Sequence, residues 1–138
     1  MQLNSADIYR IKQTFPALEV NSHSFCEYFY NCLFEFSPVL KPLFKSDRKV
    51  VEQHFFMLIK TCTSNIDDLD NFSETLALLG KKHRKFQAKP EHFTLIKSAF
   101  MLSLQYHLRE ALNRETEVAW SHYFDEISSS MLQGMKTH

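Results

Sequence analysis

The sequence predicts an all-α fold, and three observations support this prediction. Apolar residues recur at helical spacing in every long segment, and no segment alternates convincingly between apolar and polar residues. The chain has two glycines and four prolines, which leaves little of the turn chemistry that β-hairpins need. Its thirteen phenylalanines and five tyrosines require either a large packed core or a flat partner against which the rings can pack.

Length and charge narrow the class of protein. We expect residues 1–138 to form a single domain large enough to bury a core. Lys and Arg together number 16, as do Asp and Glu, and this balance differs from the basic surface of a nucleic-acid-binding protein. The polar N-terminus MQLNSADIYR does not resemble a signal peptide, and no apolar run is long enough to span a bilayer. We therefore expect a cytoplasmic protein with no nucleic-acid or membrane partner.

The three cysteines are an odd number without metal-ligand spacing. Cys26 and Cys32 are six residues apart on a predicted helix, about 9 Å along its axis, which exceeds the reach of a disulfide. We expect three buried free thiols in a reducing compartment.

Two helices and a corner are predicted in the first part of the chain. Ser5 is expected to cap the first helix, and the second runs from about Ser22 to Phe36. Pro38 and Pro42 then break the chain, because proline lacks the backbone N–H that a helix needs. The apolar stripes of the two helices consist of Ile8, Ile11, Phe15 and Leu18, and of Phe25, Phe29, Leu33 and Phe36.

The remaining segments also have helical period. The charged stretch Lys45–Lys49 leads into a third helix, and the polar run NIDDLDNFS connects it to a short helix that carries His83. Pro90 is expected to open the next helix, which is apolar nearly all round and therefore predicted to be buried in the centre. The apolar stripe of the third helix consists of Val51, Phe55, Leu58, Ile59 and Cys62. The apolar residues of the central helix are Leu95, Ile96, Ala99, Phe100, Leu102 and Leu104. The last helix has Trp120, Phe124, Ile127 and Met131 on one face.

His83 is the main candidate ligand for a metal. Leu76, Leu79 and His83 fall at i, i+3 and i+7 and so share one face of a helix. An imidazole among leucines costs free energy unless a carbonyl, a water or a metal binds it. No second His or Cys stands at zinc-ligand spacing to His83.

Four segments resemble the globins in sequence and in order. FYNCLFEFSPVLKPLF (residues 29–44) is similar to the second helix and corner of single-domain bacterial globins and of the haem domain of flavohaemoglobins. NIDDL followed by LALLGKKH (residues 76–83) resembles the same group and the neuroglobin-like globins. KPEHF and AWSHYFDEI match the starts of the last two helices. The resemblance covers nearly the whole chain.

This resemblance implies a 3-over-3 helical sandwich around a haem b pocket. His83 matches the proximal iron ligand, whose second ring nitrogen would donate to a backbone carbonyl near Leu79. Phe44 matches the phenylalanine that packs on the porphyrin face, and Lys82, next to the ligand, is also expected to contact the cofactor.

Tyr30 matches the distal tyrosine of flavohaemoglobins. A phenol on that side of the iron would donate a hydrogen bond to a bound gas molecule. The alternative is a core ring whose hydroxyl bonds to a carbonyl, as other aromatic residues crowd the same helix.

The residue that faces the iron from the third helix depends on alignment. The chain is slightly shorter than its bacterial relatives between Phe44 and NIDDL. If the gap in the alignment lies in the corner, Val51 faces the iron and Phe55 lies one turn further along the helix. If the gap lies within the helix, His54 faces the iron and Leu58 lies one turn further along. NIDDL is the stronger anchor and favours Val51. Only the His54 alignment would allow a six-coordinate bis-histidine form.

The resemblance predicts a globin that reversibly binds a diatomic gas (O2, and also NO or CO) for oxygen binding, delivery or sensing. Flavohaemoglobins have a Tyr and a Glu behind the proximal histidine, where this chain has Phe93 and Met135, so imidazolate character is not expected. The alternative is a nitric oxide dioxygenase or nitrite-reactive globin, which would need an external reductase because the sequence has no Gly-rich dinucleotide loop. A haem-free sensor domain is a third hypothesis.

Overall fold

The computed structural model describes residues 3–43, 47–68, 73–74, 76–77 and 91–136. All regular secondary structure in these ranges is helical, which confirms the predicted all-α class. Five α-helices are described: α1 (Ser5–Val20), α2 (Ser22–Phe36), α3 (Arg48–Ser64), α5 (His92–Leu108) and α6 (Arg114–Lys136). Three short 3-10 helices cover Pro38–Leu43, Ile66–Asp68 and Arg109–Ala111. In the part of the chain described, no helix is long and apolar enough to cross a membrane.

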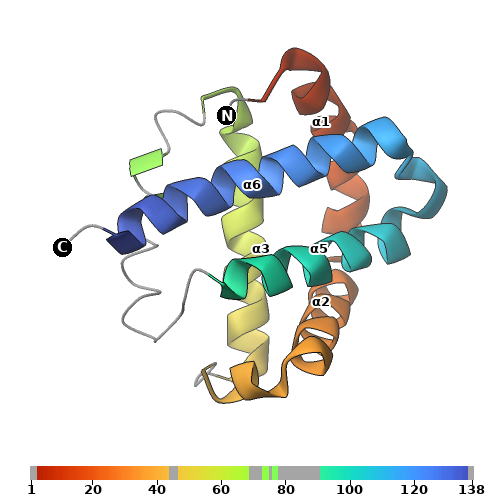
Figure 1. The fold of residues 1–138 in the computed structure, drawn as a ribbon. Helices are drawn as coiled ribbons and strands as arrows, with labels where there is room; N and C mark the ends of the chain where they lie inside the picture. The colour runs from red at the N-terminus through yellow and green to blue at the C-terminus, as the bar shows by residue number, and fades with distance from the viewer. Residues whose placement is uncertain (1–2, 44–46, 69–72, 75, 78–90, 137–138) are drawn as a thin grey trace.

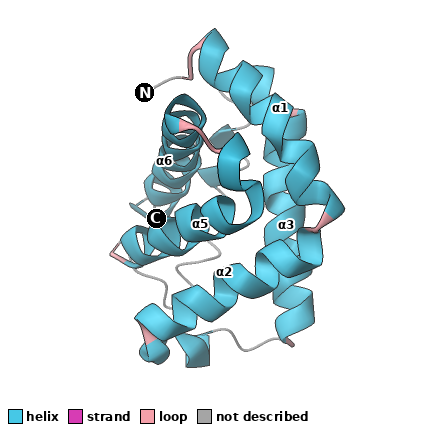
Figure 2. Cartoon of the chain, turned by 90° about the vertical axis from the view of Figure 1, so that its right-hand side faces the viewer, coloured by secondary structure: helices cyan, strands magenta, loops and turns pink. Residues whose placement is uncertain are grey.

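The helices pack in two crossed layers. In Figure 1, α5 and α6 cross in front of α3, and the side view in Figure 2 shows α5 and α6 on one side and α1 and α3 on the other. Helix α1 packs mainly against α6, and α2 packs against both α5 and α3. This places α2, which carries Tyr30, beside α3, which carries Val51 and His54.

Side-chain caps determine where the helices begin. The Asn4 Oδ1 accepts a hydrogen bond from the backbone N–H of Asp7 at 2.7 Å, so Asn4, and not Ser5, caps α1. Asn and Ser cap about equally well, and the sequence could not choose between neighbours. Asp47 caps α3 in the same way, accepting from the N–H of Lys49 at 2.8 Å.

The core is built around aromatic rings. Trp120 and Tyr123 on α6 and Phe25 and Phe29 on α2 are among the largest fully buried side chains. Phe100 on α5 is 3% exposed and lies between them. The indole Nε1–H of Trp120 donates to the Thr14 hydroxyl at 2.8 Å, so the one polar atom of this ring has a partner.

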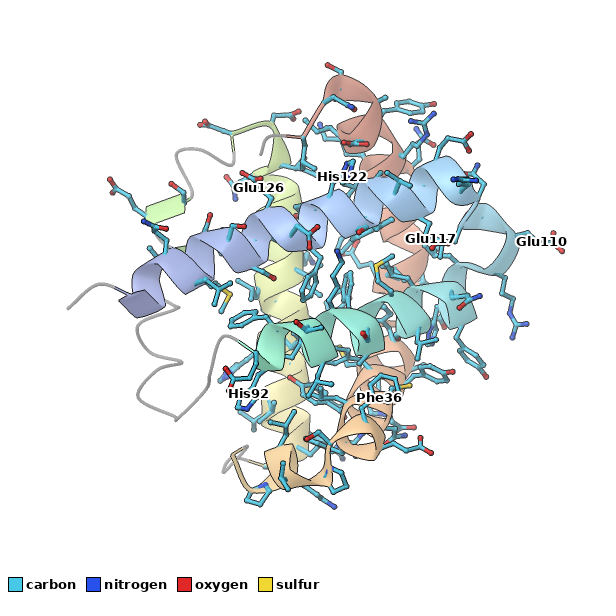
Figure 3. All side chains as sticks on the ribbon, viewed as in Figure 1. Phe36, His92, Glu110, Glu117, His122 and Glu126 are labelled. Carbon is cyan, nitrogen blue, oxygen red and sulfur yellow. The ribbon has the colours of Figure 1, made fainter. Side chains whose placement is uncertain are left out.

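Two expectations about burial are wrong. Helix α5 is not buried all round, because Leu102 and Tyr106 are 38% and 48% exposed. Phe36, which the sequence placed on the core stripe of α2, is 43% exposed and lies on the surface, as do the charged Glu110 and Glu117 (Figure 3). Periodicity identifies residues that share a helix face, but it cannot tell whether another element covers that face.

Gly134 allows the segment that leads toward His83 to pack against α6. Gly134 is buried, and a Cβ at this position would collide with the backbone carbonyl of Ala77. The neighbouring Leu76 is 2% exposed. The close approach of two backbones explains why a residue of low helix propensity stands inside α6.

We expect Gly134→Ala to lower the free energy of unfolding. The overpacking cost is about 1–3 kcal/mol, which exceeds the gain in helix propensity of about 1 kcal/mol or less. Urea denaturation measures the difference, and Gln133→Ala, at the exposed neighbouring position, is the control. A Gly134→Ala protein more stable than the wild type would contradict this packing.

Candidate functional site

The structure describes half of the residues that the sequence singles out. Tyr30 lies on α2, and Val51, His54 and Phe55 lie on α3. The other predicted site residues lie outside the described residues and remain predictions: Phe44, Leu79, Lys82 and His83.

Tyr30 is buried among aromatic rings. It is 4% exposed, and its ring centroid lies 4.8 Å from Phe29 and 5.8 Å from Phe55, in edge-on geometry in both cases. Burial raises the pKa of the Tyr30 phenol, with smaller contributions from Cys26 and Glu52. The hydroxyl therefore keeps its proton throughout the neutral range and remains a hydrogen-bond donor.

Phe55 joins α3 to the same cluster. Its ring stacks on Phe29 with centroids 4.4 Å apart and an angle of 6° between the planes. Val51 and Leu58, one turn away on either side, are half-buried like Phe55 and lie on the same face of the helix. His54 is exposed. Val51, Phe55 and Leu58 thus form a short apolar stripe on α3, and Tyr30 is a polar neighbour of Phe55 from α2.

Further half-buried apolar side chains come from the two helices of the other layer. Phe100 links them to α3, since its ring centroid lies 6.4 Å from Phe55 and 5.2 Å from Phe124. The half-buried residues packed on the core include Phe93 and Ile96 on α5, and Phe124 and Ile127 on α6. From the sequence, Ile96, Phe124 and Ile127 were placed on apolar helix faces. The helical period of such a face is the same whether other parts of the protein or a ligand cover it.

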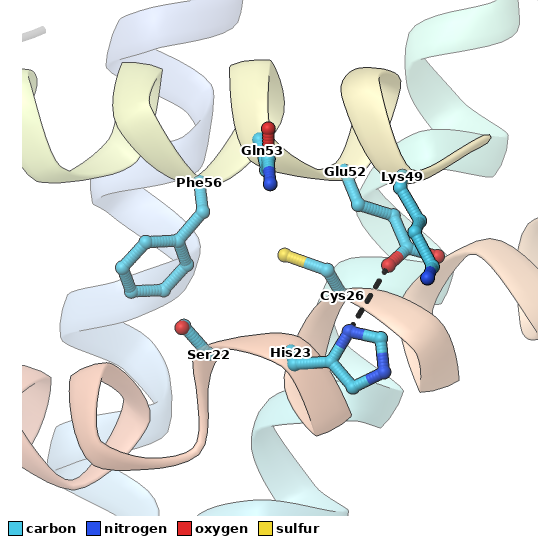
Figure 4. Close-up of a pocket in the computed structure, with 7 residues that line it drawn as sticks. All are labelled: Ser22, His23, Cys26, Lys49, Glu52, Gln53 and Phe56. Atoms are coloured by element: carbon cyan, nitrogen blue, oxygen red, sulfur yellow. Dashed lines mark ion pairs between the residues drawn. The ribbon is translucent and has the colours of Figure 1, made fainter. Parts of the chain in front are cut away.

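A polar hollow lies on a different face of α3. It has a volume of about 350 Å³ and opens between α2 and α3 (Figure 4). Its lining residues are Ser22, His23, Cys26, Lys49, Glu52, Gln53 and Phe56. The hollow is therefore separate from the apolar face that carries Val51 and Phe55.

Glu52 is the residue that sequence analysis missed. It is only 5% exposed, although a carboxylate is rarely buried without a partner. Arg48, one turn earlier on α3, places its Nε 2.9 Å from Glu52 Oε2. The signal in the sequence was an Arg and a Glu at i and i+4, but such pairs are usually solvent-exposed.

The three thiols differ in environment. Burial and then the nearby Glu52 raise the pKa of Cys26 to about 12, and burial raises that of Cys62 to about 12. Cys32 is free but half-buried, which corrects the expectation of three buried thiols. Over the described residues, no cluster of three His, Cys, Asp or Glu side chains could hold a metal ion.

We expect one cysteine of the native protein to react quickly with a thiol reagent. At pH 8 Cys32 should react with Ellman's reagent first, while Cys26 and Cys62 should react only on unfolding, because a protonated buried thiol is a poor nucleophile. Raising the pH toward 9 should speed the reaction of Cys32, because more of its thiol is then deprotonated. Cys26 and Cys62, whose pKa values lie near 12, should still react only as fast as the protein unfolds. Cys32→Ser is the control and should abolish the fast phase; a fast phase that survives it would contradict the assignment.

Two solved structures have the same arrangement of helices over nearly the whole of this chain. The structure of a hexacoordinated heme protein from an anhydrobiotic tardigrade superposes with a TM-score of 0.88 at 15% identity, covering 98% of this chain and 96% of that one. A bacterial globin from Campylobacter jejuni gives a TM-score of 0.83 at 20% identity and covers 96% of both chains. At these identities the likeness establishes the fold.

Sequence relatives point to the same family. A flavohemoprotein of Bacillus subtilis is 24% identical over 133 residues, which cover 94% of this chain but 33% of the relative. The chain thus spans about one third of that protein's length. A neuroglobin of Tetraodon nigroviridis is 25% identical over 96% of this chain and 92% of its own. The globin family model matches residues 27–131, more than half of the chain, and the protein therefore belongs to the globin family.

Proposed function

We propose that residues 1–138 act as one globin domain that holds haem b and reversibly binds a diatomic gas, with dioxygen as the principal ligand, for oxygen binding, delivery or sensing. The observation that carries this proposal is Tyr30, a buried, protonated hydrogen-bond donor surrounded by apolar rings. A polar gas complex gains from such a donor, because water is excluded and the hydrogen bond is stronger there.

The described residues fit a flat apolar cofactor. Half-buried apolar side chains on three helices, among them Phe55, Ile96 and Phe124, pack on the core yet keep part of their surface exposed. Covering such a surface with a large aromatic ring system would remove it from water, at about 25 cal/mol per Å². Haem, when bound, supplies the iron to which the gas coordinates. In this proposal His83 holds the iron, and Phe44, Leu79 and Lys82 contact the cofactor.

The alignment with Val51 on the distal side has support from burial. Val51 and Phe55 are half-buried while His54 is exposed, and the Phe55 ring is 5.8 Å from Tyr30. In our proposal Tyr30 donates the hydrogen bond, and Val51 and Phe55 exclude water from the gas. An exposed His54 would have to leave solvent to reach the iron.

Nitric oxide dioxygenation or nitrite chemistry, with an external reductase in the cytoplasm, is the second candidate. Its support is the match to flavohemoproteins. Phe93 weighs against it, because a half-buried phenyl ring cannot donate the hydrogen bond that a tyrosine would supply behind the proximal histidine. Steady-state consumption of nitric oxide with a generic reductase separates the two: a binding protein shows little turnover, whereas an enzyme turns over for many cycles.

We expect His83→Gly to lose haem during purification, because it removes the only iron ligand in the proposal. The absorption spectrum of the purified protein measures this. His54→Leu is the matched control and should keep both haem and a five-coordinate ferrous spectrum. A His83→Gly protein with full haem content would refute the ligand, and a low-spin wild-type spectrum that His54→Leu abolishes would refute the Val51 alignment.

We expect Tyr30→Phe to speed oxygen dissociation by about 5- to 30-fold, which corresponds to one hydrogen bond of about 1–2 kcal/mol. The substitution removes only the hydroxyl, and affinity changes among close variants appear mainly in dissociation rates. Stopped-flow replacement of oxygen by carbon monoxide measures the rate. Dissociation as slow as in the wild type would show that Tyr30 is a core ring without this role.

A further inference from the structure

Arg48 connects the first turn of α3 to the middle of α2. Its guanidinium nitrogen Nη2 donates to the backbone carbonyl of Glu27 at 3.0 Å and to the Asn31 Oδ1 at 2.7 Å. The same group lies over the Phe34 ring, 5.9 Å from its centroid. One side chain from α3 therefore contacts three residues of the α2 turns on either side of Tyr30.

Glu52 fixes the orientation of this guanidinium. The Nε of Arg48 donates to Glu52 Oε2 at 2.9 Å, while the other carboxylate oxygen, Oε1, lies 3.7 Å from the His23 Nδ1 across the polar hollow (Figure 4). The Glu52 side chain is 7% exposed, against 41% for Arg48. We call the pair Arg48 and Glu52, with the contacts of Arg48 to α2, the α2–α3 clamp.

The clamp lies close to the proposed gas-binding residues on both helices. Glu27 and Asn31 belong to the turn that carries Tyr30, and Glu52 directly follows Val51. Glu52 raises the pKa of Tyr30 and Arg48 lowers it, as expected of two charges near the phenol. The clamp and the Phe29–Phe55 stack thus join the same turns of α2 and α3 through different contacts.

Stability alone is a poor reason for this arrangement. Burying the Glu52 carboxylate costs free energy, and an ion pair with a 41% exposed Arg48 offsets little of that cost, because solvent screens the charge of the guanidinium. Apolar packing can slide by fractions of an ångström, whereas one planar guanidinium that donates hydrogen bonds to Glu27, Asn31 and Glu52 specifies one geometry. The clamp therefore specifies the relative position of two helices that are already held together by rings.

We propose that Arg48 and Glu52 are positioning residues, which hold the Tyr30 hydroxyl at the distance from α3 where it bonds the gas ligand, and so slow gas dissociation. This inference rests on the proposed role of Tyr30. It predicts that the clamp acts on dissociation through the hydroxyl, and that its effect disappears when the hydroxyl is absent.

The test is a double-mutant cycle on the haem-loaded protein, with oxygen dissociation as the readout. The double variant Arg48→Met/Glu52→Leu removes both charges together, so that no carboxylate is left buried without a partner. We expect dissociation about 3- to 10-fold faster than in the wild type. Added to Tyr30→Phe, the same two substitutions should cause no further acceleration beyond that of Tyr30→Phe alone. Arg48→Lys, which keeps the charge and loses the planar fork, should give a smaller increase and decides the question if the double variant does not fold.

Lys60→Met is the matched control, because Lys60 pairs with Glu19 at 2.8 Å and ties α3 to α1 at a site on the surface. It should leave dissociation unchanged. Equal acceleration by the clamp variants in the Tyr30 and Tyr30→Phe backgrounds, or no acceleration in either, would overturn the positioning role while Tyr30→Phe alone still speeds dissociation. If Tyr30→Phe alone has no effect, the proposed role of Tyr30 fails and the clamp inference fails with it.

Discussion

Phe100 on α5 lies where aromatic side chains from α2, α3 and α6 meet. Its ring centroid is 5.8 Å from Phe25, 6.4 Å from Phe55 and 6.0 Å from Trp120. These rings come from helices of both layers, so their packing fixes how the layers cross. Aromatic pairs of this kind stabilise by about 0.5–1.5 kcal/mol beyond the burial of their area. The proposed cofactor surface extends outward from this cluster.

The two sides of the α2–α3 contact have different physical characters. Tyr30 meets α3 through the ring of Phe55. Arg48 meets α2 through hydrogen bonds of 3.0 Å to the Glu27 carbonyl and 2.7 Å to Asn31, and Glu52 holds Arg48 through a hydrogen bond of 2.9 Å within α3. Rings exclude water and set the local dielectric, whereas the hydrogen bonds specify position. A gas-binding site needs both, because a single hydrogen bond to a small ligand depends steeply on distance and angle.

Much of the fold could be predicted from the sequence. The limits of α2, Ser22 and Phe36, follow from its apolar stripe and the prolines after it, and the structure has the same bounds. Exposure was harder to predict. Phe36 and Leu102 have the period of core residues, but their faces are left open, because a one-dimensional pattern does not show which helix faces are covered by other helices.

Less of the site could be predicted. The match to globin segments singled out Tyr30, and its burial agrees with either a distal donor or a core ring. The burial of Glu52 could not be read from the chain, since an Arg and a Glu at i and i+4 are usually exposed and His23 becomes a neighbour of Glu52 only when α2 and α3 pack. The choice between Val51 and His54, and the role of His83, remain predictions.

Titration of the haem-free wild-type chain with haem tests the central claim most directly. Trp120 is the chain's one tryptophan, and it packs on Phe100 next to the proposed cofactor surface, so bound haem should quench its fluorescence. We expect quenching that saturates at one haem per chain. Quenching that rises without saturation, or fluorescence that haem leaves unchanged, would contradict the claim that this surface is completed by a single cofactor.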